Sequence, residues 1–242
     1  MKQRKQVDAI YTDFSKAFDH VDNQLLLRKD NEAGFHSSFC SWIESSLTQR
    51  TQYVKIGCFL SVAIYISCPG GHCFPLLFII FISDLVDCVI NSKGLNFADD
   101  FKFWRTVESI SDQELLQEDL DRLAGWCAAN KLQLNIDKCC FISFFRKASR
   151  FQTIYSIDGR ALKYVSSDSG VVLDEKLSFV EHINTITVKS SKLLGFVLRN
   201  CKYFSLESTK LVYCSLVRSI LEYFSAVWSP YFKNHINSIK KI

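Results

Sequence analysis

The spacing of apolar positions along this 242-residue chain separates predicted strands from predicted helices. Short runs rich in β-branched and aromatic residues predict strands at residues 7–12, 51–56, 132–136, 139–145, 153–157 and 160–165. Apolar residues three or four positions apart predict helices at residues 17–29, 38–47, 111–127, 180–200 and 205–224, with a further apolar helix after Pro75. The mixture of the two patterns predicts an α+β fold.

Two short motifs predict where elements begin or turn. Residues 111–114, with the sequence SDQE, have the pattern of a capping box and predict a helix start. Asp158-Gly159 is the strongest two-residue hairpin signal in the chain. The acids of the capped helix fall mostly on the face opposite its leucines, so we expect four of them to face solvent: Glu114, Glu118, Asp119 and Asp121.

Composition narrows the class of protein. With 48% hydrophobic and 14% aromatic residues, the chain can bury a large core, which argues against disorder. A net charge of +4 permits nucleic-acid binding without demonstrating it. The ten cysteines include no Cys-x-x-Cys pair, so we interpret them as mostly reduced and buried in an intracellular protein. The cluster of Cys68, His72 and Cys73 lacks the fourth ligand of a zinc site.

A long uncharged stretch makes a membrane protein the alternative to test. No Lys, Arg, Asp or Glu occurs in residues 56–83. Residues 69–72 (PGGH) divide this stretch into two pieces, each shorter than the roughly 20 residues that a bilayer core requires. We therefore favour buried sheet and core helix here, and we expect no membrane association. The basic N-terminus has no apolar segment of the kind found in signal peptides.

Three aspartates carry the candidate chemistry. Asp99 and Asp100 are adjacent and flanked by apolar residues, which predicts a hairpin with both acids at its turn. Asp13 follows a predicted strand, so pairing of that strand with the hairpin makes the three carboxylates converge. Three carboxylates can hold two Mg²⁺ ions about 3.5–4 Å apart, as nucleotidyl transfer requires. The alternative for the Asp99-Asp100 pair is a solvated acidic turn.

A series of segments resembles the reverse transcriptase of non-LTR retrotransposons of the jockey-like kind. The segments are DFSKAFD (13–19), FADD (97–100), LQLNIDKC (132–139) and GVVLDEKLSFVEH (170–182). Weaker similarity occurs in WIESSLTQRTQYV (42–54), PLLFIIFISDL (75–85), LQEDLDRLAGWC (116–127) and LVYCSLVRSILEYFSAVWSP (211–230). The resemblance covers roughly residues 7–230. It implies an RNA-directed DNA polymerase that acts on an RNA template, a DNA primer and deoxynucleoside triphosphates.

The resemblance also implies roles for individual residues. Asp13 and Asp99 are the expected principal ligands of two Mg²⁺ ions, for which Mn²⁺ can substitute, and Asp100 is the secondary ligand. Phe18 is the expected sugar gate beneath the incoming nucleotide. Lys138 is the candidate general acid for the leaving pyrophosphate. The remaining residues implied to bind the nucleotide are Phe14 and Gly71.

The implied organisation is an antiparallel polymerase palm over residues 1–165, with no fingers region before it, and a primer-grip and mostly helical thumb-like region over residues 166–242. The family's usual loop before the apolar helix contains a Gln, whereas residues 67–78 lack this Gln and are two residues shorter. We therefore expect a truncated retrotransposon remnant with impaired activity. Its expected location is intracellular, and nuclear if it acts in retrotransposition.

A nucleic-acid-binding protein without catalysis is the second functional interpretation. The two C-terminal helices are basic, as a surface that grips a duplex needs to be. Solvated helix faces explain the same charges almost as well. The basic residues are Lys189, Lys192, Arg199, Lys202, Lys210 and Arg218.

Overall fold

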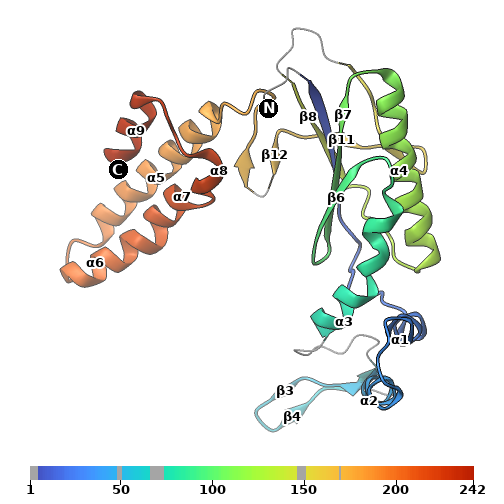
Figure 1. The fold of residues 1–242 in the computed structure, drawn as a ribbon. Helices are drawn as coiled ribbons and strands as arrows, with labels where there is room; N and C mark the ends of the chain where they lie inside the picture. Colours follow the sequence, from blue (N-terminus) through green and yellow to red (C-terminus); the bar gives the residue numbers. More distant parts are fainter. Residues whose placement is uncertain (1–4, 48–50, 66–73, 146–150, 169) are drawn as a thin grey trace. The chain divides into compact units, whose positions relative to one another are not determined.

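The structure is a computed structural model that describes residues 5–47, 51–65, 74–145, 151–168 and 170–242. The contacts divide the chain into two compact units, residues 1–165 and residues 166–242. Figure 1 shows the elements of both units. The zinc-like cluster of Cys68, His72 and Cys73, and the expected nucleotide-binding Gly71, lie outside the described residues.

The first unit is built on a five-stranded sheet with the strand order β11-β8-β1-β7-β6. The strands are β1 (Gln6–Thr12), β6 (Lys93–Phe97), β7 (Asp100–Val107), β8 (Cys140–Phe144) and β11 (Lys163–Tyr164). Only the pairing of β11 with β8 is parallel, so antiparallel pairing dominates this sheet. The fold is a mixed α+β fold, as the sequence predicts.

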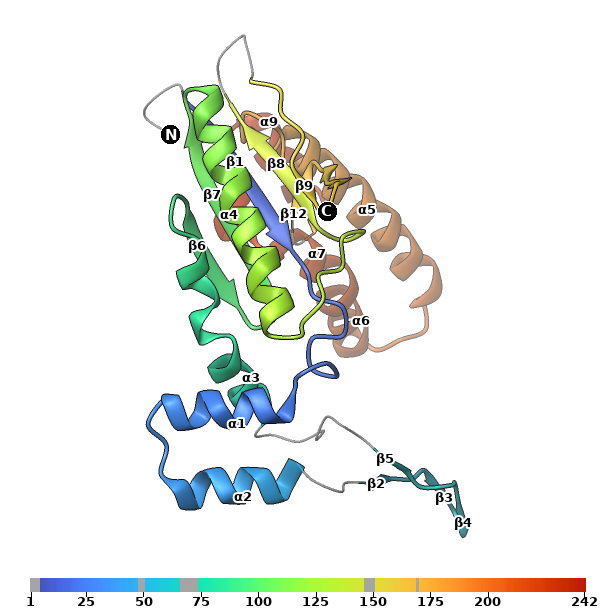
Figure 2. The same ribbon diagram turned by 90° about the vertical axis from the view of Figure 1, so that its right-hand side faces the viewer.

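Helix α4 (Ile110–Ala129) covers one face of this sheet (Figure 2). Side chains alternate along β7, where Phe101 and Phe103 are buried and Lys102 is only partly buried. The two phenylalanines join a core with the leucines of α4 and with Ile10 of β1. The register Tyr11↔Lys102 puts these two residues together on the opposite face.

Helix α1 (Asn23–Glu32) begins later than the periodicity predicts. The Asp22 carboxylate caps it by accepting hydrogen bonds of 3.0 Å from the amides of Gln24 and Leu25. Residues 15–20 form turns instead of helix, and Lys16 has a left-handed φ of 47°. The predicted helix over 17–29 is therefore wrong in its first six residues, because a polar cap decides the start of a helix.

The helices that follow agree with the sequence. Helix α2 (Ser37–Leu47) covers the predicted range 38–47. Helix α3 (Phe74–Phe81) lies within the uncharged stretch and buries Leu77, Phe78 and Phe81 in the core of the first unit. The 3₁₀ helix η1 (Ser83–Cys88) follows it. Among the described residues, no helix combines the length and apolar character needed to cross a membrane.

Two small ribbons replace the single strand predicted at residues 51–56. Strand β2 (Thr51–Gln52) pairs with β5 (Ile64–Tyr65), and β3 (Lys55–Ile56) pairs with β4 (Phe59–Leu60). Further along, residues 132–136 do not form the predicted strand. They contribute one isolated bridge, between Phe14 and Leu134. Strand β8 confirms the prediction at 139–145.

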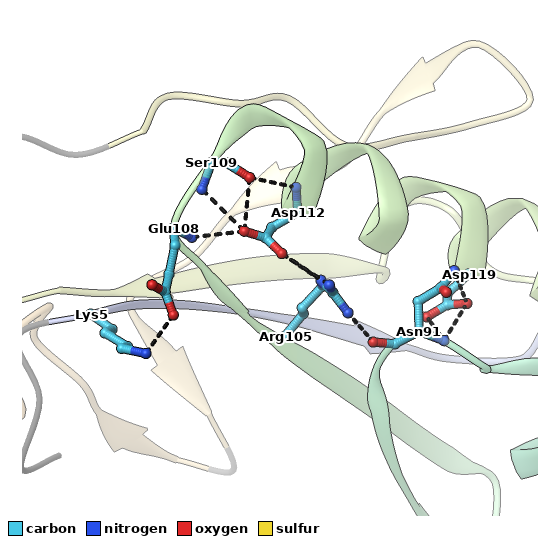
Figure 3. Close-up of polar contacts among 7 residues, drawn as sticks. All are labelled: Lys5, Asn91, Arg105, Glu108, Ser109, Asp112 and Asp119. Carbon is cyan, nitrogen blue, oxygen red and sulfur yellow. Dashed lines mark hydrogen bonds and ion pairs between the residues drawn. The ribbon is translucent and has the colours of Figure 1, made fainter.

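Polar contacts hold the start of α4 (Figure 3). The capping box begins at Ser109, two residues before the position that the sequence pattern predicts. The N-cap is Ser109, whose hydroxyl accepts from the Asp112 amide, while the Asp112 carboxylate accepts from the Ser109 amide at 3.1 Å. Arg105 of β7 donates to the same carboxylate at 2.9 Å. Hydrogen bonds from the backbone and hydroxyl donors around it, together with Arg105, lower the pKa of Asp112 although burial opposes the shift.

The expectation that Asp119 faces solvent is wrong. Its side chain is buried and accepts hydrogen bonds from the amides of Ile90 and Asn91, each at 3.1 Å, and from Arg122 at 2.7 Å. These contacts fasten the chain just before β6 to the middle of α4 (Figure 3). Asp119 therefore fixes where the β6–β7 hairpin begins. Glu114, Glu118 and Asp121 are exposed, as expected.

The Asp158-Gly159 hairpin is confirmed. Strand β9 (Ser156–Ile157) pairs with β10 (Arg160–Ala161), and the two turn residues have φ values of 49° and 75°. Positive φ at both central residues is the geometry that the Asp-Gly sequence favours.

The second unit is mostly helical. Helix α5 (Val180–Asn200) has the predicted bounds. The helix predicted at 205–224 is divided into α6 (Leu206–Tyr213), the π-helical turn η2 (Cys214–Arg218) and α7 (Ser219–Glu222). Helices α8 (Ser225–Trp228) and α9 (Lys233–Lys240) follow, and a short ribbon of β12 (Ser167–Asp168) and β13 (Val171–Val172) precedes α5. The buried core joins Val171, Ile183, Ile186 and Trp228.

Candidate active site

The sheet register brings two of the predicted aspartates to the same end of the sheet. Strand β1 pairs with β7 down to Thr12↔Phe101, so Asp13 lies one residue beyond this last pair and Asp100 one residue before it. Continued by one residue, the same antiparallel register would set Asp13 opposite Asp100. Directly opposite residues on antiparallel strands have Cα atoms about 4.5–5.5 Å apart. Figure 2 shows the end of β1 and the β6–β7 turn at the same end of the sheet.

Asp99 lies in the turn beside this pair. Strands β6 and β7 pair as far as Phe97↔Asp100, which leaves Ala98 and Asp99 as a two-residue turn. Ala98 has a left-handed φ of 52°, a conformation that costs a residue with a Cβ atom about 1–2 kcal/mol. The tight turn keeps Asp99 next to Asp100 in the chain, so the backbone places all three aspartates at the same end of the sheet.

The side chains do not form a complete metal site. Among the described residues, no three His, Cys, Asp or Glu side chains are grouped closely enough to hold a metal ion. One observation fits a cation nevertheless. The Oδ2 atom of Asp13 is buried and accepts no hydrogen bond from any described residue, so its lone pairs can coordinate a cation.

Lys138 is the cation that lies nearest to this oxygen in the described contacts. Its Nζ atom is 3.1 Å from Asp13 Oδ2, as an ion pair that lacks hydrogen-bond geometry. The side chain of Lys138 is 65% exposed, whereas that of Asp13 is 25% exposed. The sequence identifies both residues but gives no sign that they touch.

The backbone around Asp13 explains why Lys138 lies there. The Asp13 carbonyl accepts a 2.8 Å hydrogen bond from the Asn135 amide and a weak 3.8 Å contact from the Cys139 thiol. The Asn135 carbonyl in turn accepts from the amides of Lys138 and Cys139, at 2.9 and 3.0 Å. Burial raises the pKa of the Cys139 thiol to about 11, so this thiol stays protonated near neutral pH. Asn135 and Cys139 are site residues that sequence reasoning missed, because their role depends on contacts across the sheet.

The two phenylalanines of the DFSKAFD segment have different surroundings. Phe14 is 4% exposed and belongs to the core, so its ring is not available to a ligand. Phe18 is partly buried, and its ring lies 4.6 Å from that of Phe78 in α3. A ring held in this way keeps its orientation.

A cavity of about 550 Å³ lies between the end of α4, the segment that follows it and the β9–β10 turn. It is lined by side chains of α4, of residues 131–136 and of the β9–β10 turn, including Cys127, Leu134 and Asp158. The three candidate aspartates are not among its lining residues.

Most of the chain matches a known protein family. The family model described as reverse transcriptase (RNA-dependent DNA polymerase) matches residues 1–198. The chain therefore belongs to the reverse transcriptase family. No curated protein matches the sequence.

Solved telomerase structures resemble this fold at low identity. Apo telomerase from Candida tropicalis, truncated from its C-terminal domain, aligns with a TM-score of 0.47 and 17% identity over 63% of this chain. The telomerases from Candida albicans and Candida tropicalis in complex with the TWJ fragment of telomeric RNA align with TM-scores of 0.45 and 0.44, both at 14% identity, over 97% and 93% of this chain. The chain spans 33% to 40% of the length of these proteins.

Proposed function

We propose that this chain is the palm and thumb-like part of an RNA-directed DNA polymerase from a non-LTR retrotransposon. The observation that carries the proposal is the β1–β7 register, which ends at Thr12↔Phe101 and so leaves Asp13 and Asp100 next to the last pair, with Asp99 in the adjoining turn. In this proposal the first unit is the palm and the second unit, residues 166–242, is the primer-grip and thumb-like region. The substrates are an RNA template, a DNA primer and deoxynucleoside triphosphates, and the protein is intracellular, and nuclear if it acts in retrotransposition.

The residues at this end of the sheet have distinct roles. Asp13 and Asp99 would hold two Mg²⁺ ions, with Asp100 as a secondary ligand and Mn²⁺ as a substitute. Bound there, the ions supply charge stabilisation to the attacking 3′-hydroxyl and to the leaving pyrophosphate. Lys138 is placed beside Asp13 and is the candidate proton donor to the pyrophosphate.

Phe18 is the candidate sugar gate. Its contact with Phe78 fixes the ring next to the DFSKAFD turn, where a bulky side chain would collide with a ribose 2′-hydroxyl. We expect Phe18→Ala to raise the incorporation of ribonucleotides relative to deoxynucleotides. Phe14 contributes only backbone groups to a nucleotide site, because its ring is in the core.

Primer extension on an RNA template, with Mg²⁺ and separately with Mn²⁺, tests the proposal. We expect the unaltered protein to extend the primer weakly, because residues 67–78 lack the family's Gln. We expect extension to fall by at least about 100-fold in Asp13→Asn and in Asp99→Asn. Glu114→Gln is the matched control, since it removes an exposed acidic charge from α4 without touching that end of the sheet. Equal extension by all four proteins would show that the carboxylates are not the catalytic groups.

A nucleic-acid-binding protein without catalysis is the second candidate. Two observations favour it: the described residues contain no complete three-ligand metal group, and α5 and α6 expose basic side chains such as Lys192 and Lys210. Binding of a labelled RNA hairpin at several salt concentrations distinguishes the two. Salt-sensitive binding that persists in Asp99→Asn, in a folded protein with no extension activity, supports this second function.

A further inference from the structure

The contact between Lys138 and Asp13 has a use that differs from proton donation. We propose that the Lys138 ammonium is a built-in counter-ion of Asp13, and that it competes with a divalent cation for the same carboxylate oxygen. This inference rests on the proposed function, because it assumes that Asp13 binds the metal. It assigns to Lys138 control over how tightly the metal is held.

A cation near this oxygen offsets the free-energy cost of burying it. Asp13 Oδ2 is buried without a hydrogen bond, and an unpaired buried carboxylate is costly in free energy. The Lys138 Nζ atom at 3.1 Å supplies the opposite charge in the protein without metal. The carboxylate can thus stay ionised and in place before a metal arrives.

The contact is built into the fold. The amide of Asn135 is hydrogen-bonded to the Asp13 carbonyl at 2.8 Å, and the Asn135 carbonyl receives the amides of Lys138 and Cys139. These bonds tie the turn that carries Lys138 to the end of β1. The backbone therefore holds Lys138 close enough to Asp13 for its ammonium to reach the carboxylate.

The same geometry lets the ammonium leave. The Lys138 side chain is 65% exposed, so its charge regains water when it moves away, whereas the Oδ2 atom of Asp13 cannot. Departure of the ammonium is favourable only if another cation takes its place. A divalent ion and Lys138 should therefore exclude each other at this oxygen.

Direct binding of Mn²⁺ tests the competition without any activity measurement. Free Mn²⁺ is measured by electron paramagnetic resonance during titration of the folded full chain, at one pH and one ionic strength. We expect Lys138→Met to bind Mn²⁺ about three- to tenfold more tightly than the unaltered protein, since an ion pair with one exposed partner has a modest free energy. Lys138→Arg keeps the charge and should bind as the unaltered protein does.

A second lysine of the same region provides the matched control. Lys163 donates to the Asp137 carbonyl at 3.1 Å, so Lys163→Met removes one positive charge nearby without removing the Asp13 contact. We expect Lys163→Met to leave Mn²⁺ affinity unchanged. Equal tightening in Lys163→Met and Lys138→Met means that only the general electrostatic field matters, and the competition is then refuted.

The failure of the inference is distinguishable from failure of the proposed function. If the unaltered protein and Lys138→Met bind Mn²⁺ equally tightly, and Asp13→Asn abolishes binding, the metal site stands and the competition does not. If neither protein binds Mn²⁺, or if Asp13→Asn changes nothing, the proposed metal role of Asp13 fails and the competition fails with it.

Discussion

The Tyr155 hydroxyl donates a 2.7 Å hydrogen bond to the buried carboxylate of Asp8 across 147 positions of sequence. Gln6 donates to the other oxygen of Asp8 at 2.8 Å and also accepts from the Phe151 amide at 2.9 Å. Burial, followed by the charge of Asp8, raises the pKa of Tyr155, so the hydroxyl remains a donor throughout the physiological range. These contacts tie the segment before the β9–β10 hairpin to β1, the strand that ends at Thr12, just before Asp13.

Removal of this hydroxyl should destabilise the first unit. We expect Tyr155→Phe to lower the free energy of unfolding by about 1.5–3 kcal/mol, because a buried carboxylate loses a hydrogen bond. Urea unfolding followed by circular dichroism measures the change. Tyr53→Phe is the control, since Tyr53 is exposed, and it should stay within about 0.5 kcal/mol of the unaltered protein. Equal stability of the two variants would mean that the Asp8 network does not hold β1.

The two acids that contact Arg122 should differ sharply in importance. Asp119 is buried and accepts from the backbone of residues 90 and 91 as well as from Arg122, whereas Glu118 is exposed and contacts only the guanidinium in the described structure, at 3.2 Å. We expect Asp119→Ala to cost about 3–5 kcal/mol, since donors that need a buried anion are left unpaired. Glu118→Ala should cost at most about 0.5 kcal/mol. A similar small cost for both variants in urea unfolding contradicts the anchoring role of Asp119.

Local sequence signals predicted the elements that depend on local interactions. The apolar periodicity of α5 predicted both ends of the helix, and Asp158-Gly159 predicted a hairpin. Both predictions succeeded because periodicity and turn chemistry act within a few residues. Asp22, an Asp before an apolar helical run, has the sequence pattern of an N-cap. Apolar residues before Asp22 extend the helical periodicity, so the pattern predicted a helix start that is too early.

Contacts between distant segments could not be predicted in the same way. Asp119 has the position of a solvent-facing acid in the helical pattern, and only the amides of residues 90 and 91 explain its burial. The pairing of the strand before Asp13 with the hairpin was a hypothesis from sequence, and only the β1–β7 register shows that these two strands pair. The Lys138 contact depends on the turn at Asn135, for which the sequence contains no signal.

A buried carboxylate in α1 predicts a pH-dependent stability. Both side-chain oxygens of Asp30 are buried without a hydrogen bond to any described residue, and burial raises the pKa of this group above its ordinary value of 3.8. The native state therefore holds the proton more tightly than the unfolded state does. Stability from this group is fully present below about pH 3.8 and is lost as the pH rises through the folded pKa.

Neutralising this charge should stabilise the protein near neutral pH. We expect Asp30→Asn to raise the free energy of unfolding by roughly 1 kcal/mol at pH 7 and to have little effect near pH 3.5. Denaturant unfolding at both pH values measures the difference. Glu32→Gln, an exposed change in the same helix, should show no such pH-dependent gain. A gain for Asp30→Asn that is equal at both pH values would point to packing and not to charge.

Two glycines should respond to the same substitution with opposite signs. A Cβ atom added at Gly159 or at Gly125 meets no atom within 4 Å, so steric overlap does not decide either case. Gly159 has a φ of +75° in the hairpin turn, and we expect Gly159→Ala to lower the free energy of unfolding by about 1–2 kcal/mol. Gly125 lies within α4, where alanine loses less backbone entropy on folding, so Gly125→Ala should raise it by about 0.5–1 kcal/mol. Urea unfolding of both variants and of the double variant checks these values. Destabilisation by Gly125→Ala, or tolerance of Gly159→Ala, would show that backbone conformation is not what selects glycine at that position.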